Sequence, residues 1–89
     1  MLVDVTPEMD IAQSMEVFGP VFPVIGFDTF DEAMAIANNT TYGLSAGVMT
    51  GDIATAMKAA RAIQSGTCVI NGTGDYRTSY HGFGGYKMS

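Results

Sequence analysis

The 89-residue sequence predicts an α/β fold with elements in the order β-α-β-α-β. Short runs rich in Val, Ile and Phe alternate with two segments whose apolar residues recur at helical spacing. The composition, 47% apolar and 15% charged, is that of a chain able to form a core. Alternation of this kind is typical of parallel strands covered by helices. We expect this α/β core over residues 22–71, between a segment 1–21 and a glycine-rich loop 72–89.

The first strand and the first helix are predicted by adjacent signals. Residues 22–27 are rich in Val, Ile and Phe and lie between Gly19-Pro20 and Asp28-Thr29, which favours a buried strand. Thr29 and Glu32 have the spacing of a capping box, and the residues that follow at i, i+3, i+4 and i+7 predict one apolar helix face: Phe30, Ala33, Met34 and Ala37. Asn38-Asn39 should end this helix, because Asn tolerates a left-handed backbone.

The second half of the core repeats this alternation. Residues 46–49 predict a second strand, and Gly51-Asp52 opens a second helix. Its apolar face is predicted to contain Ile53, Ala56, Met57, Ala60 and Ile63. After the stop at Ser65-Gly66, the β-forming residues 67–70 predict a third strand that enters a loop at Asn71-Gly72.

Charge and cysteine content exclude several function classes. The net charge of −5 works against binding to nucleic acid and to anionic membranes. The longest apolar stretch, residues 21–27, is far shorter than a membrane helix and contains Pro23 and Gly26. Because the N-terminus lacks a signal-peptide pattern and there is a single cysteine, Cys68, we expect a reducing, cytoplasmic location.

The isolated reactive residues favour structural interpretations. Cys68 lies in an apolar strand pattern, where burial would raise its pKa, so we interpret it as a packed core cysteine. His81 is interpreted as an exposed loop residue, and one His is too few for a metal site. The Gly72-Thr73-Gly74 sequence lacks the third glycine of a dinucleotide-binding motif, because Arg77 occupies that position. Gly84-Gly85-Tyr86-Lys87 likewise lacks the pattern of a P-loop.

Glu16 leaves two interpretations open. It directly precedes Val-Phe-Gly-Pro, at the mouth of the first predicted strand. A carboxylate held there could accept hydrogen bonds from the hydroxyl groups of a ligand. Taken alone, the position favours a solvated glutamate over a ligand-binding one.

Four sequence blocks, in order, carry a family resemblance. They are Glu16-Val17-Phe18-Gly19-Pro20-Val21, residues 37–46 with the sequence ANNTTYGLSA, residues 66–71 with the sequence GTCVIN, and residues 83–89 with the sequence FGGYKMS. Together they resemble the carboxy-terminal part of the catalytic domain in the NAD(P)-dependent aldehyde dehydrogenase superfamily. The resemblance covers essentially the whole chain.

The resemblance implies roles for three residues. Glu16 is similar to the family acid that accepts hydrogen bonds from the nicotinamide-side ribose of NAD or NADP, a role that suits two acceptor oxygens facing a diol. Phe18 resembles the aromatic residue that packs beside that ribose and the nicotinamide. Phe83 resembles a residue in the wall of the aldehyde pocket, next to a variable substrate-facing loop at 72–82. Gly43, Gly84, Gly85 and Lys87 are interpreted as turn and loop positions.

Two departures and several absences qualify the resemblance. Met15 stands where the family usually has an acid, and Gly82 stands where it usually has a proline. The family oxidises aldehydes to carboxylic acids through a cysteine thiohemiacetal and thioester, and its nucleophile and general base would lie upstream of Met1. Cys68 corresponds to a structural strand residue. The resemblance therefore implies a fragment of an oxidoreductase that is inactive by itself, whose parent enzyme is a homodimer or homotetramer.

A second hypothesis treats the chain as a stand-alone interaction module derived from such an enzyme. Its exposed apolar faces would then bind a full-length subunit. The identity of the aldehyde and the choice between NAD and NADP are not determined by these residues.

Overall fold

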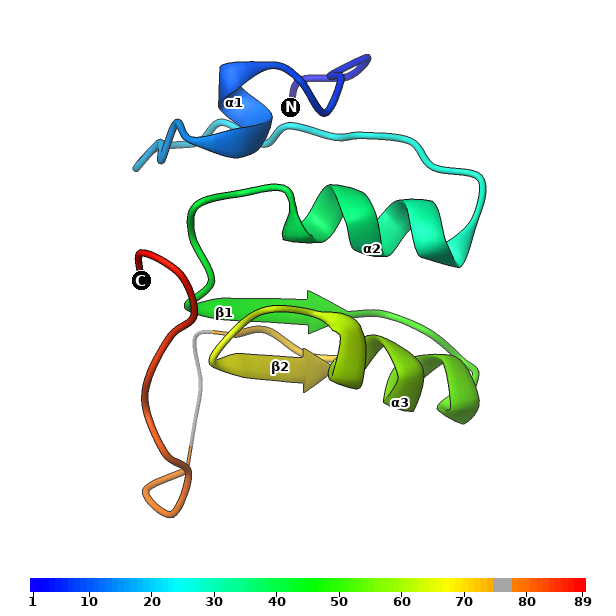
Figure 1. The fold of residues 1–89 in the computed structure, drawn as a ribbon, viewed down its shortest axis with the longest axis vertical. Helices are drawn as coiled ribbons and strands as arrows, with labels where there is room; N and C mark the ends of the chain where they lie inside the picture. The colour runs from blue at the N-terminus through cyan, green and yellow to red at the C-terminus, as the bar shows by residue number, and fades with distance from the viewer. Residues whose placement is uncertain (75–77) are drawn as a thin grey trace. The chain divides into compact units, whose positions relative to one another are not determined.

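The computed structural model describes residues 1–74 and 78–89 of the chain. These form two compact units, Met1–Thr41 and Tyr42–Ser89. The elements are α1 (Asp10–Gln13), α2 (Phe30–Asn38), β1 (Ser45–Val48), α3 (Ile53–Ala62) and β2 (Thr67–Ile70) (Figure 1). The α/β class is confirmed. Arg77 and part of the loop predicted to face the substrate lie outside the described residues.

The second unit is built on a parallel pair of strands. β1 and β2 pair with Ser45 opposite Thr67 and Val48 opposite Ile70, and α3 packs against both (Figure 1). The two strands lie within one residue of their predicted bounds. Asn71 joins their ends, because its side chain accepts from the Thr50 N–H at 2.9 Å and donates to the Thr50 carbonyl at 3.0 Å.

The helix α3 begins as predicted, and its buried face agrees with the predicted one only in part. Asp52 is its N-cap and accepts a hydrogen bond from the Thr55 N–H at 2.9 Å. Ala56 is buried as predicted, together with Ala59, which was not predicted. Ala60 and Ile63 are half-buried, whereas Ile53 is 75% exposed and Met57 is exposed as well, so the prediction was wrong for these two residues. Small alanine side chains allow the helix to lie close to the strands, and packing overrides a face drawn from hydrophobicity alone.

In the first unit, the helix α2 confirms the Thr29 cap. The Thr29 hydroxyl accepts from the Glu32 N–H at 3.1 Å, and the Glu32 carboxylate accepts from the Asp28 N–H at 2.8 Å. The helix ends at Asn38, as predicted, but Asn39 has φ −81° and is not left-handed. A hydrogen bond from the Asn39 N–H to the Ile36 carbonyl, at 3.1 Å, tightens the last turn instead.

The strand predicted at residues 22–27 is absent from the described residues. Only an isolated parallel bridge joins Leu2 and Pro23, with hydrogen bonds from the Leu2 N–H to the Phe22 carbonyl and from the Val24 N–H to the Leu2 carbonyl. Asp4 stops the ladder from extending, because its φ of 56° turns the partner segment away from extended geometry.

Candidate functional site

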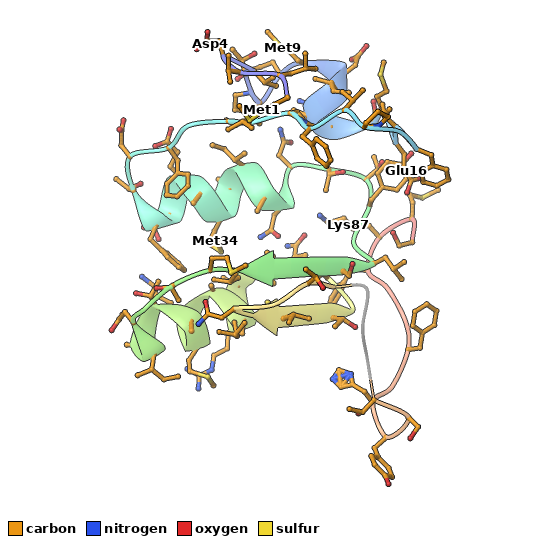
Figure 2. All side chains as sticks on the ribbon, turned by 180° about the vertical axis from the view of Figure 1, so that it is seen from behind. Met1, Asp4, Met9, Glu16, Met34 and Lys87 are labelled. Carbon is orange, nitrogen blue, oxygen red and sulfur yellow. The ribbon has the colours of Figure 1, made fainter. Side chains whose placement is uncertain are left out.

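The ribose-facing candidates Glu16 and Phe18 lie together in the first unit. They follow α1 (Figure 1), a four-residue helix that the sequence patterns did not predict; Figure 2 shows Glu16. The Ser14 and Met15 N–H groups both donate to the Asp10 carbonyl at 3.0 Å, so the chain that leads from α1 to Glu16 is fixed by its backbone. Beyond Phe18, a hydrogen bond of 2.8 Å from the Val21 N–H to the Gly19 carbonyl closes a tight turn.

Both candidate side chains are available to a ligand in this unit. Glu16 is exposed, and the Phe18 ring is 94% exposed. An exposed carboxylate offers acceptor oxygens to a diol, and an aromatic ring two residues away offers a flat apolar surface. The chemistry of this pair therefore fits the ribose and nicotinamide of NAD(P).

Phe83 lies in the second unit, on the segment that follows the loop, and is 71% exposed. The residues after it return to the start of β1. The Gly43 carbonyl accepts from the Gly66 and Tyr86 N–H groups, each at 2.9 Å, and the Gly43 N–H donates to the Ser89 hydroxyl at 2.9 Å. Phe83 is thus presented by a segment that backbone hydrogen bonds hold against the sheet.

The glycines of this region differ from the prediction. We expected Gly43, Gly84 and Gly85 to supply unusual backbone angles, but no glycine among the described residues has a positive φ. Close approach explains two of them instead, because a Cβ on Gly43 would lie 2.6 Å from the Gln64 carbonyl oxygen and one on Gly85 would lie 2.8 Å from the Ser89 Cβ. Lys87 is the residue with left-handed geometry in the final turn, at φ 54° (Figure 2).

Cys68 lies on the predicted strand, β2, but it is half-buried rather than packed in the core as predicted. Desolvation nevertheless raises the pKa of its thiol. This lowers the thiolate fraction at neutral pH, which opposes a role as nucleophile. His81 is exposed in the loop segment. Among residues 1–74 and 78–89, no three His, Cys, Asp or Glu side chains gather as a metal site, and no helix is long and apolar enough to cross a bilayer.

Comparisons with known proteins identify the class. The sequence model of the aldehyde dehydrogenase family matches residues 1–89. The chain therefore belongs to the aldehyde dehydrogenase family.

Individual relatives agree with this assignment. The chain is 51% identical over 76 residues to 4-trimethylaminobutyraldehyde dehydrogenase A of Danio rerio, covering 83% of this chain and 14% of that protein. An NAD-dependent aldehyde dehydrogenase from Sinorhizobium meliloti is 45% identical with a TM-score of 0.88, covering 96% of this chain and 16% of that one. The NAD+ complex of a Bacillus cereus aldehyde dehydrogenase is 42% identical with a TM-score of 0.87, covering 96% and 17%. The chain thus spans about a sixth of its relatives' length.

Proposed function

We propose that residues 1–89 form the part of an NAD(P)-dependent aldehyde dehydrogenase that orients the nicotinamide and walls the aldehyde pocket. The parent enzyme oxidises an aldehyde to a carboxylic acid through a cysteine thiohemiacetal and thioester. The observation that carries the proposal is the pairing of an exposed carboxylate, Glu16, with an exposed ring, Phe18, on one anchored segment. That the Bacillus cereus relative was solved with NAD+ supports the choice of cofactor.

The chain's own residues would act by binding and orientation. The Glu16 carboxylate would accept hydrogen bonds from the two ribose hydroxyls, and the Phe18 ring would limit rotation of the adjacent nicotinamide. When bound, the nicotinamide supplies the hydride acceptor. Phe83 would exclude water from one side of the aldehyde pocket. None of these residues attacks the carbonyl or moves a proton.

The test is Glu16→Gln in the full-length subunit that carries these residues. The substitution keeps the size of the side chain and removes its charge, so the cofactor Kd should rise about tenfold, as expected when a charge-assisted hydrogen bond is weakened. Kd is measured by titration with NAD+ and NADP+, and hydride transfer by single-turnover absorbance of the reduced nicotinamide. Glu8→Gln, which removes the same charge elsewhere in the first unit, is the matched control. Equal Kd values for the Glu16→Gln variant and the wild type would remove Glu16 from the site.

The 89-residue chain alone should give no turnover and no measurable NAD binding. Two ribose-side contacts cannot offset the entropy lost by a bound dinucleotide. The Cys68 thiol, with its raised pKa, is not a substitute nucleophile. Protein-dependent growth of reduced-nicotinamide absorbance with the purified chain would contradict this part of the proposal.

A second candidate function is the stand-alone interaction module. It is favoured by large apolar side chains exposed in both units, among them Phe22, Phe27 and Ile53 at 60–75% exposure. In this case the chain would bind a full-length aldehyde dehydrogenase subunit. Co-migration of the purified chain with such a subunit in size-exclusion chromatography would support it, whereas separate elution would exclude it.

A further inference from the structure

Three side-chain hydrogen bonds within the first unit connect the end of α1, the Pro7 carbonyl before it, and the residues that follow α2. The Thr40 hydroxyl donates to the Gln13 carbonyl at 2.6 Å. The Gln13 side-chain amide donates to the Pro7 carbonyl at 2.7 Å, and the Asn39 amide donates to the same carbonyl at 3.2 Å. The Pro7 carbonyl therefore has two donors, and Gln13 both accepts and donates.

Two of these bonds are partly buried and one is exposed. The Thr40–Gln13 and Gln13–Pro7 bonds are the partly buried ones. Partial removal of water strengthens a hydrogen bond and raises the cost of leaving its groups unpaired. The Asn39 bond, which is exposed and longer, should contribute less.

Gln13 is the last residue of α1 and lies three residues before Glu16. The intervening residues, Ser14 and Met15, are held by hydrogen bonds from their N–H groups to the Asp10 carbonyl. If the end of α1 moved, Glu16 would therefore move with it. On the far side of Phe18, the chain is held by the bridge from Leu2 to residues 22–24. The segment with Glu16 and Phe18 is anchored at both ends, and its upstream anchor combines local backbone hydrogen bonds with the side-chain hydrogen bonds of Gln13 and Thr40.

We propose that Thr40 and Gln13 are positioning residues for Glu16 and Phe18, an inference that rests on the proposed function. Neither residue needs to touch the cofactor. Their hydrogen bonds fix the end of α1, and α1 fixes the direction in which the Glu16 carboxylate leaves the chain. Binding geometry is sensitive to shifts of about 1 Å, so a loosened α1 would weaken the hold on the ribose.

A neighbouring cleft makes this role separable from general stability. A cavity of about 240 Å³ is lined by six polar residues: Gln13, Ser14, Asn38, Asn39, Thr40 and Thr41. Because Thr40 borders this cleft, loss of its hydrogen bond to Gln13 should loosen the end of α1 more than it disturbs packing. The effect should appear in cofactor binding more than in the melting temperature.

The test compares Thr40→Val with Thr40→Ser in the full-length subunit. Valine keeps the shape and removes the hydroxyl, so the cofactor Kd should rise about fivefold, the effect of losing one partly buried hydrogen bond, while the KM for the aldehyde stays unchanged. Serine keeps the hydroxyl and should restore the wild-type cofactor Kd. Thr41→Val, at the adjacent cleft position, is the matched control and should bind cofactor as the wild type does.

The outcomes separate this inference from the proposed function. The positioning role would be overturned if Thr40→Val had a wild-type cofactor Kd, or if Thr40→Ser bound the cofactor as weakly as Thr40→Val does. Either result would leave the proposed function intact. A wild-type subunit without NAD(P)-dependent aldehyde oxidation would overturn both. If Thr40→Val does not fold, the variant Gln13→Met tests the positioning role instead. It removes the amide that donates to Pro7 and should also weaken cofactor binding; an unchanged Kd would overturn the inference.

Discussion

The two units of the chain hold their functional segments by different means. In Tyr42–Ser89, backbone hydrogen bonds hold the segments together. A parallel ladder joins β1 and β2, and the Gly43 carbonyl accepts hydrogen bonds from the Gly66 and Tyr86 N–H groups. In Met1–Thr41, the only bridge joins Leu2 and Pro23, and side chains supply the remaining long-range hydrogen bonds described above. The segment that carries Phe83 is thus held by backbone hydrogen bonds, whereas the long-range hydrogen bonds that hold the segment of Glu16 and Phe18 come largely from side chains.

This difference predicts how each unit responds to substitution. Backbone hydrogen bonds remain when a side chain is changed, so the second unit should be vulnerable mainly where an added side chain forces its backbone segments apart. In the first unit each deleted side chain removes one bond, so the losses should be small and distributed.

Gly66→Ala should have the largest effect. A Cβ on Gly66 would overlap the Gly84 carbonyl oxygen and lie 3.0 Å from the Gly85 Cα, and both are backbone atoms. The segment that presents Phe83 would have to move, at a cost of about 3 kcal/mol in the free energy of unfolding, the upper part of the range for overpacking. Denaturant titration measures this loss.

Gly51→Ala is the matched control for this substitution. No atom lies within 4 Å of a Cβ built on Gly51, and its φ is not positive. Alanine there should leave stability unchanged or raise it by about 0.5 kcal/mol, because it restricts the unfolded chain. If Gly66→Ala were as stable as Gly51→Ala, the second unit would not depend on close backbone approach.

Thr29→Ala should cost less, about 1 kcal/mol, because it removes one N-cap hydrogen bond from α2. Thr29→Ser keeps the hydroxyl and should retain most of the stability. The midpoint of urea unfolding measures both variants. A loss for Thr29→Ala as large as that for Gly66→Ala would contradict the idea that the first unit rests on small, separate contributions.

Local chemistry explains which parts of the fold the sequence predicts well. The caps at Thr29 and Asp52 depend on residues three positions apart, and the strand at 67–70 is a continuous run of β-formers, so nearby residues suffice. The strand predicted at 22–27 was wrong because pairing depends on a distant partner, and the left-handed Asp4 limits that partner to one bridge. The helix α1 is too short for a periodic pattern to reveal.

The candidate site, like the fold, has parts that the sequence predicts and parts that depend on residues far apart in the chain. The roles of Glu16, Phe18 and Phe83 come from the family blocks, and they stay predictions. The hydrogen bonds of Thr40 and Gln13 link positions 27 residues apart, and no local spacing indicates them. The need for glycine at position 66 is likewise a long-range effect, since the clash is with Gly84.

Asp52→Asn should have the smallest effect of the three stability changes. Asp52 caps α3 at the exposed end of the second unit, away from the backbone contacts of Gly43 and Gly66. Asparagine is also a good N-cap, so the hydrogen bond to the Thr55 N–H can persist while the charge at the helix N-terminus is lost. The melting temperature at pH 7 should therefore fall only slightly.

The pH dependence of the melting temperature tests whether the negative charge of Asp52 causes its stabilising effect. Hydrogen bonds from the Thr55 hydroxyl, and then from the Thr55 N–H, hold the pKa of Asp52 below its ordinary value of 3.8. A group whose pKa is lower in the folded state stabilises the protein fully above its unfolded pKa, and this stabilisation disappears as the pH falls through the folded pKa. The difference in melting temperature between wild type and Asp52→Asn should hence be constant from pH 7 to about pH 5, begin to shrink near the ordinary pKa of 3.8, and vanish only below the lower pKa of the folded state. A difference that persists unchanged in acid would show that Asp52 acts through its shape rather than its charge.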